Sequence, residues 1–203
     1  MPRYKDAERE QIREQVRRRL IEAALREFAE QGYGGANINR ISQAAGFAQG
    51  TVYNYFPSKR ALFEAVVEEI AAHHSELILQ GAGTAAEPAA RLERFFGVGF
   101  AFAQGFPAAA RLILSALYGP DAENRALVRR AYERLLSYLE CEIVQAGALE
   151  RCFRPLETKL VTAVILAVYL GGCATGEEAD RMRQNPRAVA ALLLDGLRGE
   201  AHG

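Results

Sequence analysis

The stretch Gly32–Phe63, GYGGANINRISQAAGFAQGTVYNYFPSKRALF, decides the fold of this chain. It contains two short segments with the apolar spacing of helices, and Gly46 lies between them. The second segment begins with the small polar run Gln49-Gly50-Thr51 and continues into the aromatic run Tyr53 to Phe56. A helix that presents short polar groups, with aromatic and basic side chains around it, is suited to reading the edges of DNA bases.

The spacing within residues 40–53 predicts a helix-turn-helix. Two closely crossing helices need a small residue four positions before the turn glycine, which is Ser42, and an apolar residue six positions after it, which is Val52. The turn itself needs a positive φ, which Gly46 supplies. The second helix would then point Gln49, Gly50, Thr51 and Asn54 away from the core.

Side-chain chemistry supports a DNA contact at this second helix. Gln and Asn form bidentate hydrogen bonds to adenine, Thr contacts bases through its hydroxyl or methyl group, and Gly allows close approach of the backbone. Tyr53, Tyr55 and Lys59 suit phosphate contact. Packing against neighbouring helices is the alternative role for both tyrosines, and we expect Phe56 to be a core residue.

A longer pattern resembles the DNA-binding domain of the TetR family of transcriptional regulators over about residues 18–63. The residues that carry the resemblance are Ala23-Ala24, Phe28, Gly32-Tyr33, Ile41, Ala45-Gly46, Gly50-Thr51-Val52-Tyr53, Tyr55-Phe56, Ser58-Lys59 and Leu62-Phe63. The resemblance implies a homodimer that binds double-stranded DNA at a palindromic operator, with half-sites about 34–36 Å apart. By position, the DNA contacts it implies are Asn37, Asn39, Gln49, Gly50, Thr51, Tyr53, Asn54, Tyr55 and Lys59.

The chain departs from the family pattern at two places. Where the family usually has Thr or Ser near the start of the first helix of the motif, this chain has Ala36-Asn37, and Asn can still cap a helix. Where the family often has Ser-Lys before Gly-Thr, this chain has Ala48-Gln49. The second change removes a helix cap and a positive charge, so we expect more reliance on direct hydrogen bonds to bases.

The charge distribution divides the chain. Its 203 residues have a net charge of zero, but residues 1–60 contain 11 Lys and Arg against 7 Asp and Glu, a net charge of +4. The remainder carries 14 basic and 18 acidic residues, a net charge of −4. Because phosphate attraction depends on the local surface, this favours a DNA-binding domain at residues 1–57 and an effector-binding and dimerisation domain at residues 58–203.

Apolar spacing is helical almost everywhere, and the seven prolines fall at joints. We therefore predict an all-α fold, in which a three-helix N-terminal domain is followed by a larger helical C-terminal domain. We expect about nine helices, which cover residues 6–30, 38–45, 49–55, 58–79, 88–104, 107–117, 121 to beyond 143, 157–171, and 186–198. Gly32 is the expected left-handed stop of the first helix, and Ser58 is the expected cap of the fourth.

The C-terminal domain is rich in aromatic residues. Gly97 and Gly99 lie among them, and each glycine inside a helix costs about 1 kcal/mol relative to alanine. Either a cavity for an apolar ligand or a close helix crossing would justify that cost, and an aromatic stripe at this spacing can also be plain core. The candidate ligand contacts are Phe95, Phe96, Phe100, Phe102, Tyr118, Tyr132 and Tyr169.

The last two expected helices are too apolar for one buried face, which indicates a second buried face. In the family that the chain resembles, these helices form a four-helix dimer interface. The residues expected there are Val161, Val164, Ile165, Val168, Val189, Leu193 and Leu197.

The sequence gives little support for a catalytic, cofactor or metal site. The sequence has no GxSxG, HExxH or P-loop motif, so we expect no enzyme, no cofactor and no metal site. Cys141, Cys152 and Cys173 lack zinc-site spacing, and we expect them to be buried small apolar residues, with redox sensing as the alternative. His73-His74 suits a surface or hinge role. The charged N-terminus and the lack of a long apolar run favour a cytoplasmic protein without a membrane partner.

Together these features predict a TetR-like transcriptional regulator, most simply a repressor released by a small hydrophobic or amphipathic effector. A ligand-dependent activator and a helical protein-interaction adaptor without DNA binding are the alternatives.

Overall fold

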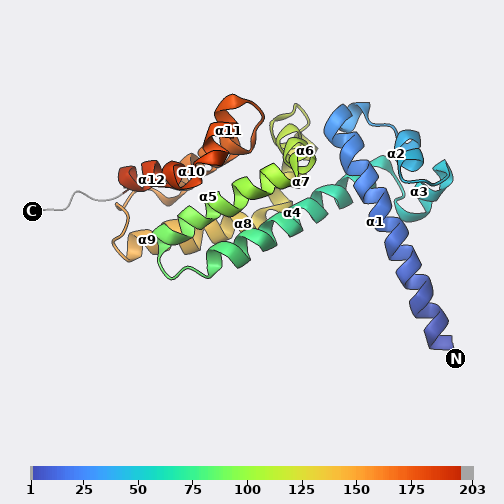
Figure 1. Cartoon of the computed structure of the whole chain (residues 1–203), viewed down its shortest axis with the longest axis horizontal. Helices are drawn as coiled ribbons and strands as arrows, with labels where there is room; N and C mark the ends of the chain where they lie inside the picture. The colour runs from blue at the N-terminus through green and yellow to red at the C-terminus, as the bar shows by residue number, and fades with distance from the viewer. Residues whose placement is uncertain (1, 198–203) are drawn as a thin grey trace, which may run out of the picture.

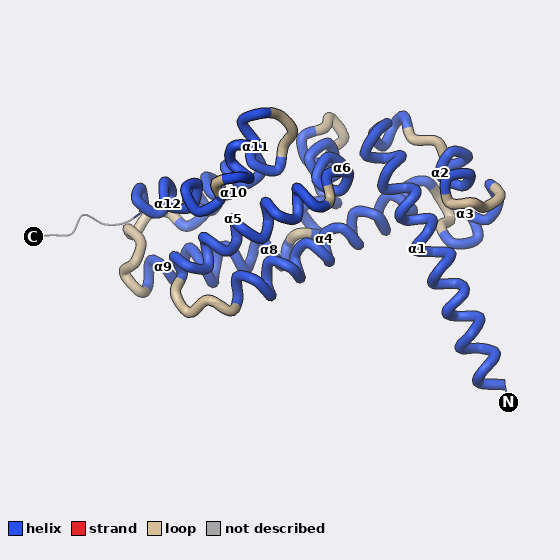
Figure 2. Tube along the Cα trace, in the orientation of Figure 1, coloured by secondary structure: helices blue, strands red, loops and turns tan. Residues whose placement is uncertain are grey.

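The computed structural model describes residues 2–197, with side chains from residue 8 onward. Within this range the chain is helical and contains no strand, so the predicted all-α fold is confirmed (Figures 1 and 2). The elements are α1 (Pro2–Gly35), α2 (Ile38–Ala44), α3 (Gln49–Tyr55), α4 (Lys59–Gly83), α5 (Pro88–Gly105), α6 (Pro107–Tyr118), α7 (Ala122–Ala131), α8 (Glu133–Tyr138), the π-helical segment η1 (Leu139–Gln145), α9 (Ala146–Leu149), α10 (Thr158–Cys173), α11 (Glu177–Gln184) and α12 (Pro186–Leu197).

The molecule is elongated. Helices α1–α3 form one end, α12 lies at the other, and α4 and α5 run side by side along the body between them (Figure 1). The helices begin and end close to the residues predicted from the sequence. Prolines open α5, α6 and α12, and the Ser58 hydroxyl caps α4 by accepting a hydrogen bond of 3.0 Å from the Ala61 N–H. Gly32 interrupts α1 with a φ of 67°.

Two helical segments differ from the prediction. The long helix expected from residue 121 to beyond 143 is broken at Tyr132, where φ is −97° and ψ is 6°, and it continues as α8, η1 and α9. No glycine or proline marks this break in the sequence. Helix α11 was not expected, because the segment Glu177–Gln184 is mostly charged and only Ala179 is buried. Its helix therefore has almost no apolar period for a sequence pattern to detect.

Two hydrophobic clusters make up the core. The first joins α1–α3 to the start of α4, to α6 and to α7, so the buried surface continues past the proposed domain boundary at residue 57. The second joins α5, η1, α10 and α12 to the end of α4. Helix α4 contributes to both clusters, since Ile70 belongs to the first and Ile78 to the second. The clusters meet at the turn of α4 that carries His74.

Close crossing of α5 and α10 explains one of the two glycines inside α5, Gly97 and Gly99. A Cβ atom on Gly99 would overlap the phenol of Tyr169, and a Cβ atom on Gly172 would overlap the ring of Phe100. A Cβ atom on Gly97 would meet nothing within 4 Å. The glycine at position 99 therefore serves helix packing, not open space.

The cysteine expectation was wrong in part. Cys141 and Cys152 are exposed, because both lie on the outer side of the segment that follows α8, and only Cys173 is largely buried.

None of the described helices is both long and apolar enough to cross a bilayer alone, although the bent pairs α5–α6 and α10–α11 have the combined length and composition.

The helix start at Ala48 yields a stability prediction. Ala48 has the extended backbone of an N-cap residue, with φ of −68° and ψ of 150°, but no side chain that can cap α3. We expect Ala48→Ser to raise the free energy of unfolding by about 0.5–1 kcal/mol, because its hydroxyl would accept a hydrogen bond from a free N–H of the first turn. Urea denaturation of the full chain measures this. Ala44→Ser, at an exposed position late in α2, is the control, and an equal gain in both variants would contradict a capping effect.

Candidate nucleic-acid interface and ligand cavity

Helices α2 and α3 form the predicted helix-turn-helix. Gly46 has a φ of 77°, in the left-handed region that favours glycine. Ser42 is buried and its hydroxyl donates to the Ile38 carbonyl oxygen at 2.9 Å, so no polar group is left unpaired where the helices cross. Val52, which is 1% exposed, fixes α3 against the core. The three positions inferred from spacing therefore have the geometry that the motif requires.

The face of α3 opposite Val52 is polar and open to solvent. Gln49, Gly50, Tyr53 and Asn54 are exposed and share one side of the helix at i, i+1, i+4 and i+5, and Thr51 at its edge is half-buried. Tyr53 remains 49% exposed. This is the arrangement that direct readout of a major groove needs, with amide and hydroxyl groups projecting from a fixed helix.

The start of α2 adds a second exposed group of polar atoms. Asn37 caps α2 by accepting a hydrogen bond of 2.8 Å from the Asn39 N–H. The Asn37 N–H donates to the Glu27 carboxylate at 2.9 Å, and Arg40 pairs with the same carboxylate at 2.9 Å. Both asparagines are exposed, so the cap leaves them accessible from solvent.

Tyr55 and Lys59 are more involved in packing. Tyr55 is half-buried against the first hydrophobic cluster. The Lys59 ammonium donates to the Gly34 carbonyl oxygen at 3.1 Å and lies 5.2 Å from the centre of the Tyr33 ring. Lys59 therefore ties the start of α4 to the end of α1.

A second basic residue joins α4 to the body. The Arg60 guanidinium donates to the Glu64 carboxylate at 2.8 Å and to the side-chain oxygen of Asn124 at 2.7 Å. Asn124 is buried at the start of α7. In addition, α6 packs directly on α1. Through these contacts, a displacement of α6 or α7 would be transmitted to the helix-turn-helix.

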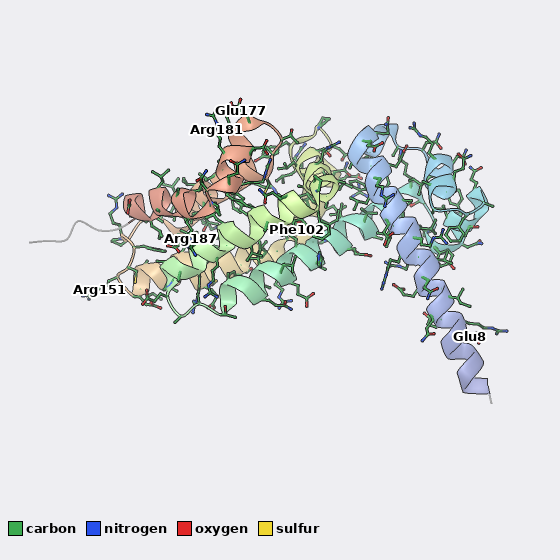
Figure 3. The ribbon with its side chains drawn as sticks, viewed as in Figure 1. Glu8, Phe102, Arg151, Glu177, Arg181 and Arg187 are labelled. Carbon is green, nitrogen blue, oxygen red and sulfur yellow. The ribbon has the colours of Figure 1, made fainter. Side chains whose placement is uncertain are left out.

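An apolar cavity of about 120 Å³ lies in the body where the two hydrophobic clusters meet. Its walls come from α4 (His74), α5, α6, α7, α8 and α10, together with Tyr132 at the break between α7 and α8. Phe102 covers its α4 side, stacked on the His74 ring at a centroid distance of 4.2 Å, and Figure 3 shows this residue near the middle of the molecule. The lining is almost entirely hydrocarbon.

The polar atoms of the cavity form one hydrogen-bonded row. His74 Nδ1 lies 3.1 Å from the Tyr132 hydroxyl, and Nε2 lies 2.7 Å from the Tyr169 hydroxyl. Burial, with a smaller contribution from His73, lowers the pKa of His74 to about 4. The imidazole is therefore neutral near pH 7, donating through one nitrogen and accepting through the other.

The same burial keeps the neighbouring groups protonated. It raises the pKa of Tyr169 and of Tyr132, and it raises the pKa of Cys173 to about 11. A protonated thiol is a poor nucleophile, so Cys173 is not activated towards oxidants. The side chains of His74, Tyr132, Tyr169 and Cys173 are thus all uncharged near pH 7.

The cavity contains some of the aromatic residues that the sequence suggested. Phe95, Phe102, Tyr132 and Tyr169 line it. Phe96 and Phe100 are buried in the second cluster behind it, and Tyr118 lies outside, 69% exposed.

The surface role expected for His74 was wrong, because this residue is 6% exposed. The signal that could have placed it was its position in the stripe Val67, Ile70, His74 and Ile78, whose i, i+3, i+4 spacing continues through the histidine. The α6 side of the cavity was not predicted at all.

The predicted dimer residues fall on two sides of their helices. Val161, Ile165 and Leu197 are buried in the second cluster of this protomer, and Val168, Val189 and Leu193 are partly buried against it. Val164 is 46% exposed. On the same helix Leu160 is 58% exposed, and on α12 Leu192 is 77% exposed; small exposed residues extend the apolar face of each helix. Among the described residues no cluster of His, Cys, Asp and Glu could hold a metal ion.

Comparison of the sequence with known families gives a match at residues 20–66 to the family described as bacterial regulatory proteins, tetR family. Among curated proteins, the HTH-type transcriptional repressor AcnR of Corynebacterium glutamicum is 39% identical over 62 residues. This similarity covers 30% of the chain and 33% of AcnR, so the match spans about a third of that relative's length.

Solved structures resemble the whole chain in fold. The regulator FadR from Bacillus subtilis, solved in complex with stearoyl-CoA, superposes with a TM-score of 0.79 and 22% identity, covering 89% of this chain and 98% of that one. AibR, solved with isovaleryl coenzyme A and operator DNA, gives a TM-score of 0.68 at 18% identity, covering 90% and 97%. At these identities the similarity shows the architecture.

The buried histidine yields a pH prediction. Because the pKa of His74 is lowered to about 4 from an ordinary value of 6.5, the folded state favours the neutral ring. The resulting stability is present above about pH 6.5 and is lost as the pH falls towards 4. We expect His74 to remove about 2 kcal/mol of unfolding free energy between pH 7 and pH 4.5. Urea titrations should show that His74→Gln lacks this loss, whereas the exposed His73→Gln retains it; equal slopes would contradict a buried neutral His74.

Proposed function

Through residues 20–66 the chain belongs to the TetR family, and we propose that it is a transcriptional regulator, most simply a repressor that a small ligand releases from DNA. In this proposal residues 1–57 form the DNA-binding domain and residues 58–203 the effector-binding and dimerisation domain. The observation that carries it is the exposed polar face of α3, held at a fixed angle by the glycine turn at Gly46.

We assign direct base readout to the exposed side chains of α3. Gln49 and Asn54 offer bidentate hydrogen bonds, Thr51 a hydroxyl and a methyl group, and Gly50 close backbone approach. Asn37, Asn39 and Tyr53 are accessible for phosphate contact at the sides of the groove. Tyr55 and Lys59, which also pack internally, would position α3 as well as touch the backbone of the DNA.

A palindromic operator requires two copies of this face, and the open apolar face on α10 and α12 supports a homodimer. Leu160, Val164 and Leu192 are the large exposed residues on it. Exposed leucines on α10 and α12 cost free energy unless a second surface covers them. A two-fold dimer through this face would present two α3 helices to successive major grooves.

The effector would bind in the apolar cavity. FadR and AibR, which share the fold, were solved with acyl-coenzyme A molecules. We therefore propose an effector with an acyl-like apolar part. Because α6 forms one cavity wall and packs on α1, and because His74 is part of α4, a ligand that alters these walls would shift the angle of the helix-turn-helix.

Selection of DNA from a random duplex pool tests this function. The purified full-length chain should enrich a palindrome whose half-site centres are one helical turn, or a whole number of turns, apart. Binding should weaken steeply as salt is raised. Absence of any enriched sequence from ligand-free protein would instead favour the adaptor alternative.

Residues on α3 provide the sharper test. We expect Gln49→Ala and Thr51→Ala each to weaken binding to the selected operator by about 1–3 kcal/mol, with relaxed preference at one base pair, because each removes a contact to a base edge. Fluorescence anisotropy with labelled duplex measures the effect. Gln145→Ala, an exposed glutamine on η1 far along the chain, is the matched control and should bind normally. Normal operator binding by both α3 variants would refute base readout by this face.

The dimer face has a similarly matched pair of variants. Leu192 on α12 is 77% exposed and Leu149 on α9 is 84% exposed, but only Leu192 lies on the proposed interface. We expect Leu192→Glu to shift the chain to a monomer, since it buries a charge in an apolar interface, and Leu149→Glu to leave the dimer intact. Light scattering after size-exclusion chromatography reports the mass of each. A dimer that survives Leu192→Glu would place the interface elsewhere.

A further inference from the structure

A second depression adjoins the apolar cavity and shares one wall with it. This groove is open, has a volume of about 740 Å³ and is lined by residues of α5, α6, α10 and α11, among them the charged Arg111, Asp180 and Arg183. Ala103, Ala110, Leu114, Leu170 and Cys173 line both spaces. The hydrocarbon-lined cavity and the open groove therefore border each other at these five side chains.

The cavity limits the apolar part of a ligand to a small size. Its volume of about 120 Å³ is slightly below the roughly 150 Å³ of an engineered cavity that binds benzene. About six carbon atoms would fill it. Tyr169 sets this limit from the α10 side, where its ring packs against Gly99, and Phe102 sets it from α5.

The groove has a positive charge that is not neutralised. Arg183 donates to the carbonyl oxygens of Gly172 at 2.7 Å and Ala174 at 2.6 Å, and it pairs with Asp180. Arg111, on α6, is exposed, and no hydrogen bond or ion pair joins it to another described residue. Because these are the only charged residues that line the groove, Arg111 leaves it with a net charge of about +1.

We propose that the effector has two parts, a short apolar chain of about six carbons in the cavity and an anionic head in the groove that pairs with Arg111. This inference rests on the proposed function of the cavity as the effector site. A carboxylate and a phosphate-bearing group share the required chemistry, since both accept charge-assisted hydrogen bonds from a guanidinium. Tyr118, exposed on the groove wall, offers a ring on which a planar head can stack.

Calorimetric titration of the full-length chain with a series of defined probes tests the proposal. The probes are hexanoyl-CoA, palmitoyl-CoA, hexanoate and hexanol. We expect an anionic six-carbon probe to bind more tightly than hexanol and hexanoyl-CoA to bind more tightly than palmitoyl-CoA. Tighter binding of hexanoyl-CoA identifies a phosphate-bearing head, and tighter binding of hexanoate identifies a carboxylate; both results support the two-part ligand.

Three arginine variants locate the head. Arg111→Gln should raise the Kd of the best anionic probe about fivefold at low salt, with little change for hexanol. Arg129 lines the cavity on α7 but not the groove, so Arg129→Gln tests a competing position for the head. The exposed Arg130 beside it lines neither space, so Arg130→Gln should bind as the parent does. Far-ultraviolet circular dichroism and melting temperature confirm that each variant is folded.

Several outcomes would overturn the proposal. An unchanged Kd in Arg111→Gln, a loss confined to Arg129→Gln, tighter binding of palmitoyl-CoA, hexanol binding as tightly as the anionic probes, or no binding by any probe each contradicts a two-part ligand with its head in the groove. Operator binding by the ligand-free parent protein is measured separately. Hence a lack of operator binding would not contradict the two-part ligand. An unchanged Kd in Arg111→Gln would not contradict the proposed role as a transcriptional regulator.

Discussion

The burial of α4 in both hydrophobic clusters is the constraint on which the rest of the structure depends. Its first turns pack with α1–α3, its last turns pack with α5 and α8, and the seam between the clusters falls at His74. Because the helix is continuous over 25 residues, a displacement of its body end is carried to its start. There, Lys59 holds the end of α1 and Arg60 holds α7. The same helix therefore supports the DNA-reading face and forms a wall of the cavity.

The seam also contains a row of buried polar side chains. Hydrogen bonds between His74, Tyr132 and Tyr169 satisfy polar atoms that would otherwise be buried without partners. A ligand bound in the cavity would contact this row and the α6 wall together, and α6 packs on α1. Two routes thus lead from one cavity to the helix-turn-helix, through α4 and through α6. A ligand needs only a differential affinity for two arrangements of these helices to change the population that fits DNA.

The sequence predicted the part of the fold that depends on local rules. Ser42, Gly46 and Val52 were identified from spacing alone, because a tight turn between two crossing helices admits few residue types, and prolines and Ser58 marked the helix starts for the same reason. The cavity depends on contacts between helices distant in sequence, and there prediction was partial. Phe96 and Phe100 could not be distinguished from Phe95 and Phe102, since all four have helical spacing and the crossing of α10 decides which face the cavity. Helix α11 was not predicted, because it is stabilised by charge pairs and by contacts with neighbouring helices and has no apolar stripe.

Because packing sets the cavity, the ligand of a structural relative does not transfer with the fold. FadR holds stearoyl-CoA in the same architecture, yet here the α5–α10 crossing at Gly99 brings the Tyr169 ring into the space between the helices. A tyrosine ring occupies the volume of several methylene groups, so one side chain can separate a site for a long chain from a site for a short one. The helix-turn-helix shows the opposite behaviour, since its geometry admits little variation and its sequence is shared with AcnR at 39% identity. The helix-turn-helix is thus fixed by backbone requirements such as the positive φ at Gly46, whereas the cavity is fixed by side-chain volumes such as that of Tyr169.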